Sequence, residues 1–67
     1  MDVARRIGAK VRELRSAQGL SQEELAARAN LDRTYISQVE RAVKNVTIVS
    51  LEKIATGLGV TLAELVA

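Results

Sequence analysis

The sequence predicts an all-α fold, a compact domain of five helices, and three observations support this class. Apolar residues recur at helical spacing: Ile7, Val11, Leu14 and Gln18 share one stripe, which Val3 and Ala4 extend backwards. No segment carries a competing strand signal. Capping and stop residues divide the chain into five segments without a repeat, a linker or a low-complexity tract. We therefore expect residues 1–67 to form a single domain.

The composition restricts the kinds of site that this chain can contain. It has 67 residues, 48% of them hydrophobic, and Tyr35 is its one aromatic residue, so the core must be small and aliphatic. Cysteine and histidine are both absent, which argues against a disulfide, a zinc site or a cysteine or histidine nucleophile, and no metal or cofactor is expected. The net charge of +2 is compatible with a polyanionic partner without identifying one.

The sequence also bears on cellular location. No apolar run approaches the roughly 20 residues that a membrane-spanning helix needs, so no membrane partner is expected. The segment MDVARRIGAK has arginines but no apolar stretch after them, unlike a secretory signal. A soluble cytoplasmic protein is the resulting expectation.

Local signals place the first two helices. The first should end at Gly19, a residue suited to a left-handed stop. Ser21 and Glu24, three residues apart, form the capping box of the second helix. Asn30 is the best non-glycine residue for the left-handed turn that follows.

Three further helices follow by the same rules. We expect Asp32 to cap the third, Thr47 the fourth, and Thr61 with Glu64 a short fifth, while Gly59 ends the fourth. The segment RAVKN between the third and fourth helices is expected to be a polar loop. The expected apolar faces are Ile36 and Val39 in the third helix; Ile48, Leu51, Ile54, Ala55 and Leu58 in the fourth; and Leu62, Leu65 and Val66 in the fifth.

The second and third helices predict a helix-turn-helix over about residues 21–41. Only about three residues around Asn30 join them, so the two helices must cross steeply. With Ile36 and Val39 pointing inward, the opposite face of the third helix has no acid at its centre. Its side chains are Thr34, Ser37, Gln38 and Arg41, flanked by Arg33 and Tyr35. Hydroxyl, amide and guanidinium groups bond base edges and phosphates, so this face indicates contact with double-stranded DNA.

One acidic residue of the third helix requires a separate explanation. Glu40 lies at the edge of the buried stripe, and a buried carboxylate needs a partner. Arg15 occupies the matching edge of the first helix. We therefore expect an Arg15–Glu40 ion pair that holds the third helix against the first.

These residues carry a family resemblance. The segment SQEELAARANLDRTYISQVERAVKN resembles the helix-turn-helix of the lambda repressor/Cro-like (XRE) family, and the similarity runs from about Ile7 to Leu65. More narrowly, LDRTYIS with the following KNVT resembles the controller proteins of restriction–modification systems. The chain departs from the family at Asn30, where glycine is common, and at Ala42 and Val43, where more polar loop residues are expected.

The resemblance implies a sequence-specific transcription regulator that binds a palindromic operator as a homodimer, in the cytoplasm of a bacterium or phage-infected cell and associated with the nucleoid. RNA polymerase is a further candidate partner. The residues implied as base contacts are Arg33, Thr34, Ser37 and Gln38, and those implied as backbone contacts are Gln22, Tyr35, Arg41, Lys44 and Asn45. For Tyr35, packing at the edge of the core is an equal alternative.

The segment of about residues 48–67 is expected to form the dimer interface, because it contains more apolar side chains than the core of one protomer can bury. The candidates are Val49, Val60, Leu62, Leu65 and Val66, with Leu65 or Val66 near the centre. The alternative is that these residues only close the core of the monomer.

Two other classes of function compete with a DNA-binding regulator. A protein-binding module of the same fold, such as an antitoxin-like partner or another XRE-type regulator, stays open, although the acid-free face of the third helix argues against it. An enzyme is not expected, because no serine has a plausible base beside it and histidine and cysteine are absent.

Overall fold

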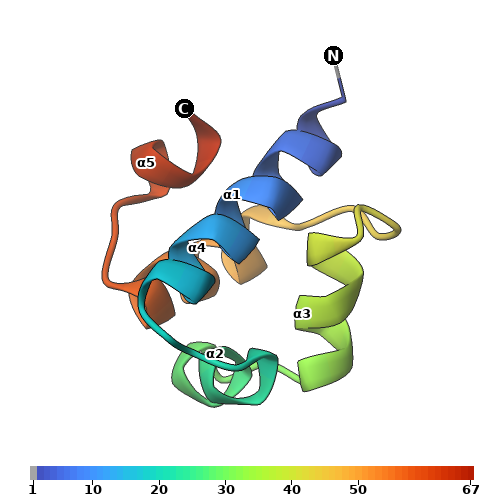
Figure 1. Ribbon diagram of the computed structural model, residues 1–67. Helices are drawn as coiled ribbons and strands as arrows, with labels where there is room; N and C mark the ends of the chain where they lie inside the picture. Colours follow the sequence, from blue (N-terminus) through green and yellow to red (C-terminus); the bar gives the residue numbers. More distant parts are fainter. Residues whose placement is uncertain (1) are drawn as a thin grey trace.

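Five helices follow one another in the computed structural model, which describes residues 2–67 (Figure 1). They are α1 (Val3–Ala17), α2 (Gln22–Ala29), α3 (Arg33–Glu40), α4 (Ile48–Leu58) and α5 (Leu62–Val66). No strand occurs among these described residues, so the prediction of an all-α fold with five helices is confirmed. Within the same part of the chain, none of the helices has the length and apolar character needed to cross a membrane.

Each helix begins at a side-chain cap. The predicted capping boxes are present: Ser21 pairs with Glu24 at the start of α2, and Thr61 pairs with Glu64 at the start of α5. The side chains of Asp32 and Thr47 cap α3 and α4 as expected. Sequence reasoning missed the cap of α1, where the Asp2 carboxylate accepts hydrogen bonds from the backbone N–H groups of residues 4 and 5.

The first four helices end in the same backbone motif. The residues with positive φ are Gly19 (68°), Asn30 (55°), Ala42 (58°) and Gly59 (71°). In each case the N–H of the positive-φ residue and the N–H of the next residue bond carbonyls of the last helical turn, which is the Schellman arrangement. The stops at Gly19, Asn30 and Gly59 were predicted. Ala42 was not, because alanine gives no local signal for a left-handed conformation.

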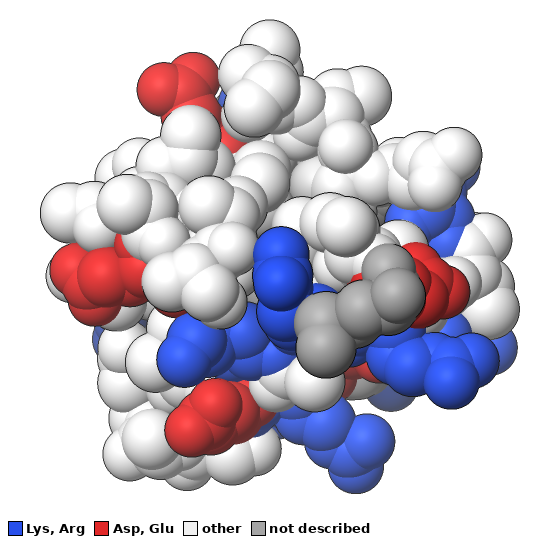
Figure 2. Space-filling view, turned by 90° about the horizontal axis from the view of Figure 1, so that it is seen from above, with Lys and Arg blue, Asp and Glu red and all other residues white. Residues whose placement is uncertain are grey.

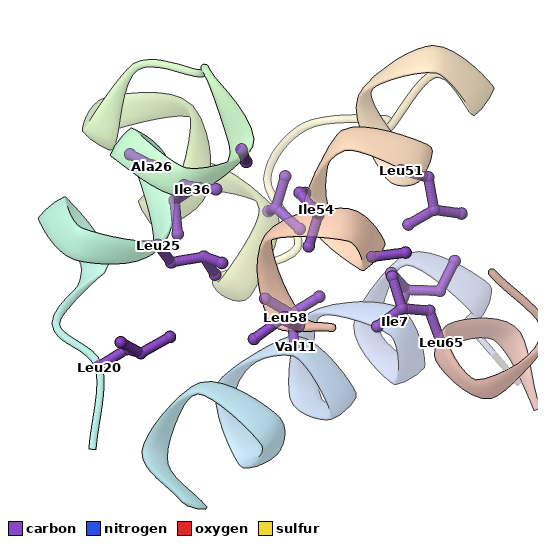
Figure 3. Packing of buried hydrophobic residues seen from close by; sticks show 13 residues of the cluster. Ile7, Val11, Leu20, Leu25, Ala26, Ile36, Leu51, Ile54, Leu58 and Leu65 are labelled. Carbon is purple, nitrogen blue, oxygen red and sulfur yellow. The ribbon is translucent and has the colours of Figure 1, made fainter. Parts of the chain in front are cut away.

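The core is aliphatic and lies between α1, α2 and α4, closed by α3 and α5 (Figure 3). Its buried residues are Ile7, Val11, Leu20, Leu25, Ala26, Ala29, Ile36, Val39, Leu51, Ile54, Ala55, Leu58 and Leu65. The structure corrects two expected core positions, because Val3 is 54% exposed and Ile48 is 64% exposed. Each is the first residue of its helix, where the apolar stripe runs past the packed region. Gln18 is also exposed, and its amide donates to the Leu58 carbonyl oxygen at 2.7 Å.

Gly8 allows α1 and α3 to approach closely. A Cβ atom at this position would lie 2.4 Å from the carbonyl oxygen of Val39 and 3.0 Å from that of Glu40. The end of α3 therefore rests on the backbone of α1, and any larger residue would push the two helices apart. Sequence reasoning did not identify this contact.

Candidate nucleic-acid interface

Helix α3 lies at one side of the molecule, with α2 at its start and the loop to α4 at its end (Figure 1). Its inner residues, Ile36 and Val39, are 0% and 1% exposed, which fixes the face that turns outward. Of the predicted contact residues on α3 and at its end, Arg33, Thr34 and Arg41 are exposed, and Ser37 and Gln38 are partly exposed. The structure therefore presents these five side chains at the surface, where a partner could reach them.

A side-chain cap defines the start of α3. The Asp32 carboxylate accepts a hydrogen bond from the Thr34 backbone N–H at 2.7 Å. This cap fixes the first turn, which carries Arg33 and Thr34. At the other end, Arg41 Nε lies 3.4 Å from the Ser37 carbonyl oxygen, so the guanidinium folds back along its own helix.

Tyr35 combines two environments. Its ring is partly buried and packs against the hydrophobic core, and the Lys44 ammonium lies 5.6 Å from the ring centroid. This distance is within the range of a cation–π interaction, so the ring helps to hold Lys44 beside α3. Lys44 and Asn45 are both exposed in the loop to α4, the region predicted to contact the DNA backbone.

The structure contains the Arg15–Glu40 ion pair. Arg15 Nε donates to Glu40 Oε2 at 2.7 Å and Nη2 donates to Oε1 at 3.0 Å, while Nη1 donates to the Leu20 carbonyl oxygen at 2.8 Å. The two side chains are only 15% and 3% exposed. The hydrogen bond to Glu40 raises the pKa of Arg15, against the lowering effect of burial. The pair therefore places the guanidinium and the carboxylate opposite each other in a largely buried place.

Gln22 belongs to the same network. Its Nε2 donates to Glu40 Oε1 at 3.1 Å, so the first residue of α2 is joined to the last residue of α3. Sequence reasoning placed Gln22 only at the DNA backbone and missed this bond. No local pattern in the sequence predicts this bond, because the two residues are 18 positions apart and belong to different helices.

The structure divides the predicted dimer residues into three groups. Val49 on α4 is 61% exposed and Val66 on α5 is 38% exposed, so both are available for an interface. Val60 and Leu62 are partly buried and pack against the core. Leu65 is 1% exposed, and its expected place near the centre of an interface is corrected: its side chain closes the core of the protomer itself.

Charged side chains of both signs share one face of the molecule. On the face in Figure 2, basic side chains lie beside acidic ones, and no unbroken basic field covers that face. On α1, Lys10 lies 3.9 Å from Glu13, and Arg5 and Arg12 are exposed at the surface. Among the described residues, no group of acidic side chains could hold a metal ion.

A helix-turn-helix family model matches residues 11–65, a range that contains the whole of α2, α3 and α4. The chain belongs to this helix-turn-helix family. Within the family it is 51% identical over 65 residues to the control protein C.MunI of a Mycoplasma species, a match that covers 96% of this chain and 88% of that protein.

Two solved family structures share the fold. The restriction–modification controller protein C.AhdI from Aeromonas hydrophila matches with a TM-score of 0.90 and 47% identity, over 92% of this chain and 94% of that chain. The controller protein C.Esp1396I was solved as a tetramer in complex with its natural 35 base-pair operator. It matches with a TM-score of 0.87 and 43% identity, over 91% of this chain and 80% of that chain.

Proposed function

We propose that this protein is a restriction–modification controller, a transcription regulator that binds a specific double-stranded DNA operator. One observation carries the proposal: α3 is fixed by its caps and core residues so that Arg33, Thr34, Ser37 and Gln38 meet the surface together. The family membership and the operator complex of a relative that is 43% identical support it.

In this function α3 enters the major groove. Arg33 is suited to a bidentate bond with guanine, and Thr34, Ser37 and Gln38 offer shorter polar groups to neighbouring base edges. The start of α2 with Gln22, together with Arg41, Lys44 and Asn45, contacts the phosphate backbone. Tyr35 supports Lys44 through its ring and also packs at the edge of the core.

The regulator acts as a homodimer on an inverted repeat. One short helix reads only a few base pairs, so two copies related by a two-fold axis give the discrimination that one copy lacks. Half-sites are then about 34 Å apart, or a multiple of that distance. Helix-turn-helix residues 21–41 bind DNA, and residues 48–67 supply the interface, with Val49 and Val66 as its exposed apolar members.

This function is not enzymatic, and it places the protein on DNA in the cytoplasm of a bacterial or phage-infected cell, in the nucleoid. Contact with RNA polymerase belongs to the same proposal. A protein-binding, antitoxin-like module is the alternative, and the exposed arginine and hydroxyl groups of α3 favour DNA over it.

The decisive experiment selects bound sites from a pool of random duplexes and then measures affinity for the selected site over a series of salt concentrations. We expect an inverted repeat to emerge, with binding that weakens steeply as salt rises. Selection of no common sequence, with equal affinity for any duplex, would contradict sequence-specific regulation.

A further inference from the structure

The carboxylate of Glu40 sits between two partners, one of which is a predicted DNA contact. Its Oε2 accepts from Arg15 Nε, and its Oε1 accepts both from Arg15 Nη2 and from Gln22 Nε2. The Glu40 side chain is 3% exposed, so the carboxylate faces these groups and is shielded from solvent. Gln22 is partly exposed, so part of this residue reaches the surface.

A carboxylate controls the orientation of an amide in a way that a hydroxyl or another amide does not. An ionised carboxylate only accepts hydrogen bonds, so the Gln22 side chain must point its NH2 group toward Glu40. An amide NH2 group carries two N–H donors, and the bond to Glu40 uses one of them. The second N–H is left for another acceptor, and a phosphate oxygen is an acceptor only.

The location of Gln22 adds a second constraint. It is the first residue of α2, where backbone N–H groups have no partner within the helix and attract anions, although the Ser21 hydroxyl already accepts from the Glu24 N–H and the carboxylates of Glu23 and Glu24 lie on the same turn. A carboxylate close to such a place would ordinarily repel a phosphate. Here Arg15 donates two hydrogen bonds to the carboxylate and offsets its charge.

We propose that Glu40 is a positioning residue for DNA binding: it holds the Gln22 amide so that an N–H group, and not the carbonyl oxygen, meets the DNA phosphate. This inference rests on the proposed function. The ion pair with Arg15 then has two roles. It attaches α3 to α1, and it offsets the negative charge of Glu40, so that this carboxylate can accept from Gln22 without repelling the DNA phosphate.

The test compares two matched variants that both lack the charges of Arg15 and Glu40. They differ only in whether position 40 can accept a hydrogen bond from Gln22, so the hydrogen bond is tested apart from the ion pair. The first is Arg15→Met with Glu40→Met, in which two apolar side chains replace the pair and keep the fold, as such replacements often do. The second is Arg15→Met with Glu40→Gln, in which the amide oxygen at position 40 can still accept from Gln22, although less strictly than a carboxylate, because an amide also carries donors. Thermal unfolding followed by circular dichroism establishes that each variant is folded at the temperature of the binding experiment.

Affinity is then measured by fluorescence anisotropy with a labelled duplex carrying the selected operator. We expect the Glu40→Met form to bind about twofold to tenfold more weakly than the Glu40→Gln form, because the neutral hydrogen bond that orients the Gln22 amide is lost. We expect this difference to disappear when both forms also carry Gln22→Ala. A purely structural role of Glu40 would change the unfolding temperature without any such dependence on Gln22.

Two results would overturn the inference. The first is equal affinity of the two folded variants, and the second is a difference that persists after Gln22→Ala, which would mean that Glu40 acts through another group. A wild-type protein that selects no duplex would instead overturn the proposed function, and the inference with it, so the two failures are distinguished by the wild type alone.

Discussion

Arg15 and Glu40 connect the last turn of α1 to the last residue of α3 through two hydrogen bonds of 2.7 and 3.0 Å. At the same end of α3, the backbone of Gly8 lies so close that a Cβ atom there would be 2.4 Å from the Val39 carbonyl oxygen and 3.0 Å from that of Glu40. A close backbone contact and a largely buried ion pair therefore hold the same end of α3. This end precedes the loop with Lys44, so the attachment fixes both the angle of α3 and the start of the loop.

Removal of either partner of the ion pair should destabilise the protein strongly. Arg15→Ala or Glu40→Ala leaves a charge that is largely buried and unpaired, at a cost of about 3 kcal/mol or more. Urea unfolding of both single variants and the double variant gives the coupling energy. The control is the exposed pair of Lys10 and Glu13, whose removal should cost less than about 1 kcal/mol. Purely additive effects of Arg15→Ala and Glu40→Ala would contradict the coupling.

Truncation of Arg33 and truncation of Lys44 should change DNA binding in different ways. Arg33→Ala should cost about 1–3 kcal/mol on the selected operator and relax its base preference, because a bidentate base contact is lost. Lys44→Ala should weaken binding to all duplexes alike and flatten the salt dependence, because only a phosphate contact is lost. Binding to the operator and to single-base variants of it measures both effects. An Arg33→Ala protein with unchanged affinity and preference would show that Arg33 does not read a base.

Ala42→Gly should stabilise the protein by up to about 1 kcal/mol. Ala42 has φ of 58°, which is strained for alanine and not for glycine, although glycine loses part of this gain through the entropy of the unfolded chain. Thermal or urea unfolding measures the difference. Ala27→Gly, at an exposed position inside α2, is the matched control and should destabilise by about 1 kcal/mol. A loss of stability in Ala42→Gly would contradict the assignment of strain to this turn.

Glu24 should make the stability of the protein depend on acidity. Hydrogen bonds from the Ser21 backbone N–H and then from the Ser21 hydroxyl lower the pKa of Glu24 in the folded state. The stability from this group is therefore fully present above the unfolded-state pKa and is lost as pH falls through the lower folded-state pKa. Glu24→Gln should flatten the loss of melting temperature toward acid pH, whereas Glu23→Gln, on the same turn, should not. An unchanged acid slope in Glu24→Gln would contradict this source.

The dimer should depend on exposed apolar residues of α4 and α5. Val49→Asp or Val66→Asp should shift the protein toward monomer in sedimentation equilibrium and weaken binding to the palindrome, because a charge is buried in the interface. Val3→Asp changes a valine of similar exposure on α1 and should leave the assembly intact. Leu65→Asp is unsuitable for this test, since it would unfold the protomer. Wild-type protein that is monomeric at micromolar concentration would contradict the dimer.

Sequence reasoning succeeded where the deciding interactions are local. The caps at Ser21, Asp32, Thr47 and Thr61 are hydrogen bonds across two or three residues, so residue type and spacing predict them. The stops at glycine and asparagine follow from backbone conformation alone. The edge positions of Arg15 and Glu40 on their helices were enough to suggest their pairing.

The features that the sequence did not predict depend on how the helices are placed in space. Leu65 and Val66 are adjacent apolar residues of a helix of five residues, and periodicity in so short a segment cannot say which one turns inward. The contact at Gly8 and the bond between Gln22 and Glu40 depend on the distance between helix axes. Ala42 adopts a left-handed conformation because the path from α3 to α4 demands it. The DNA-contacting roles of Arg33, Thr34, Ser37 and Gln38 stay predictions.

The single aromatic ring of this chain gives it a simple optical property. Tyr35 is the only tyrosine, and tryptophan and phenylalanine are both absent. Its ring packs on α3 beside the Lys44 ammonium, 5.6 Å from the ring centroid. All intrinsic ultraviolet fluorescence therefore originates at this place. A change in fluorescence lifetime on addition of unlabelled operator would report on the surroundings of α3, without a dye and without a second emitter to dilute the signal.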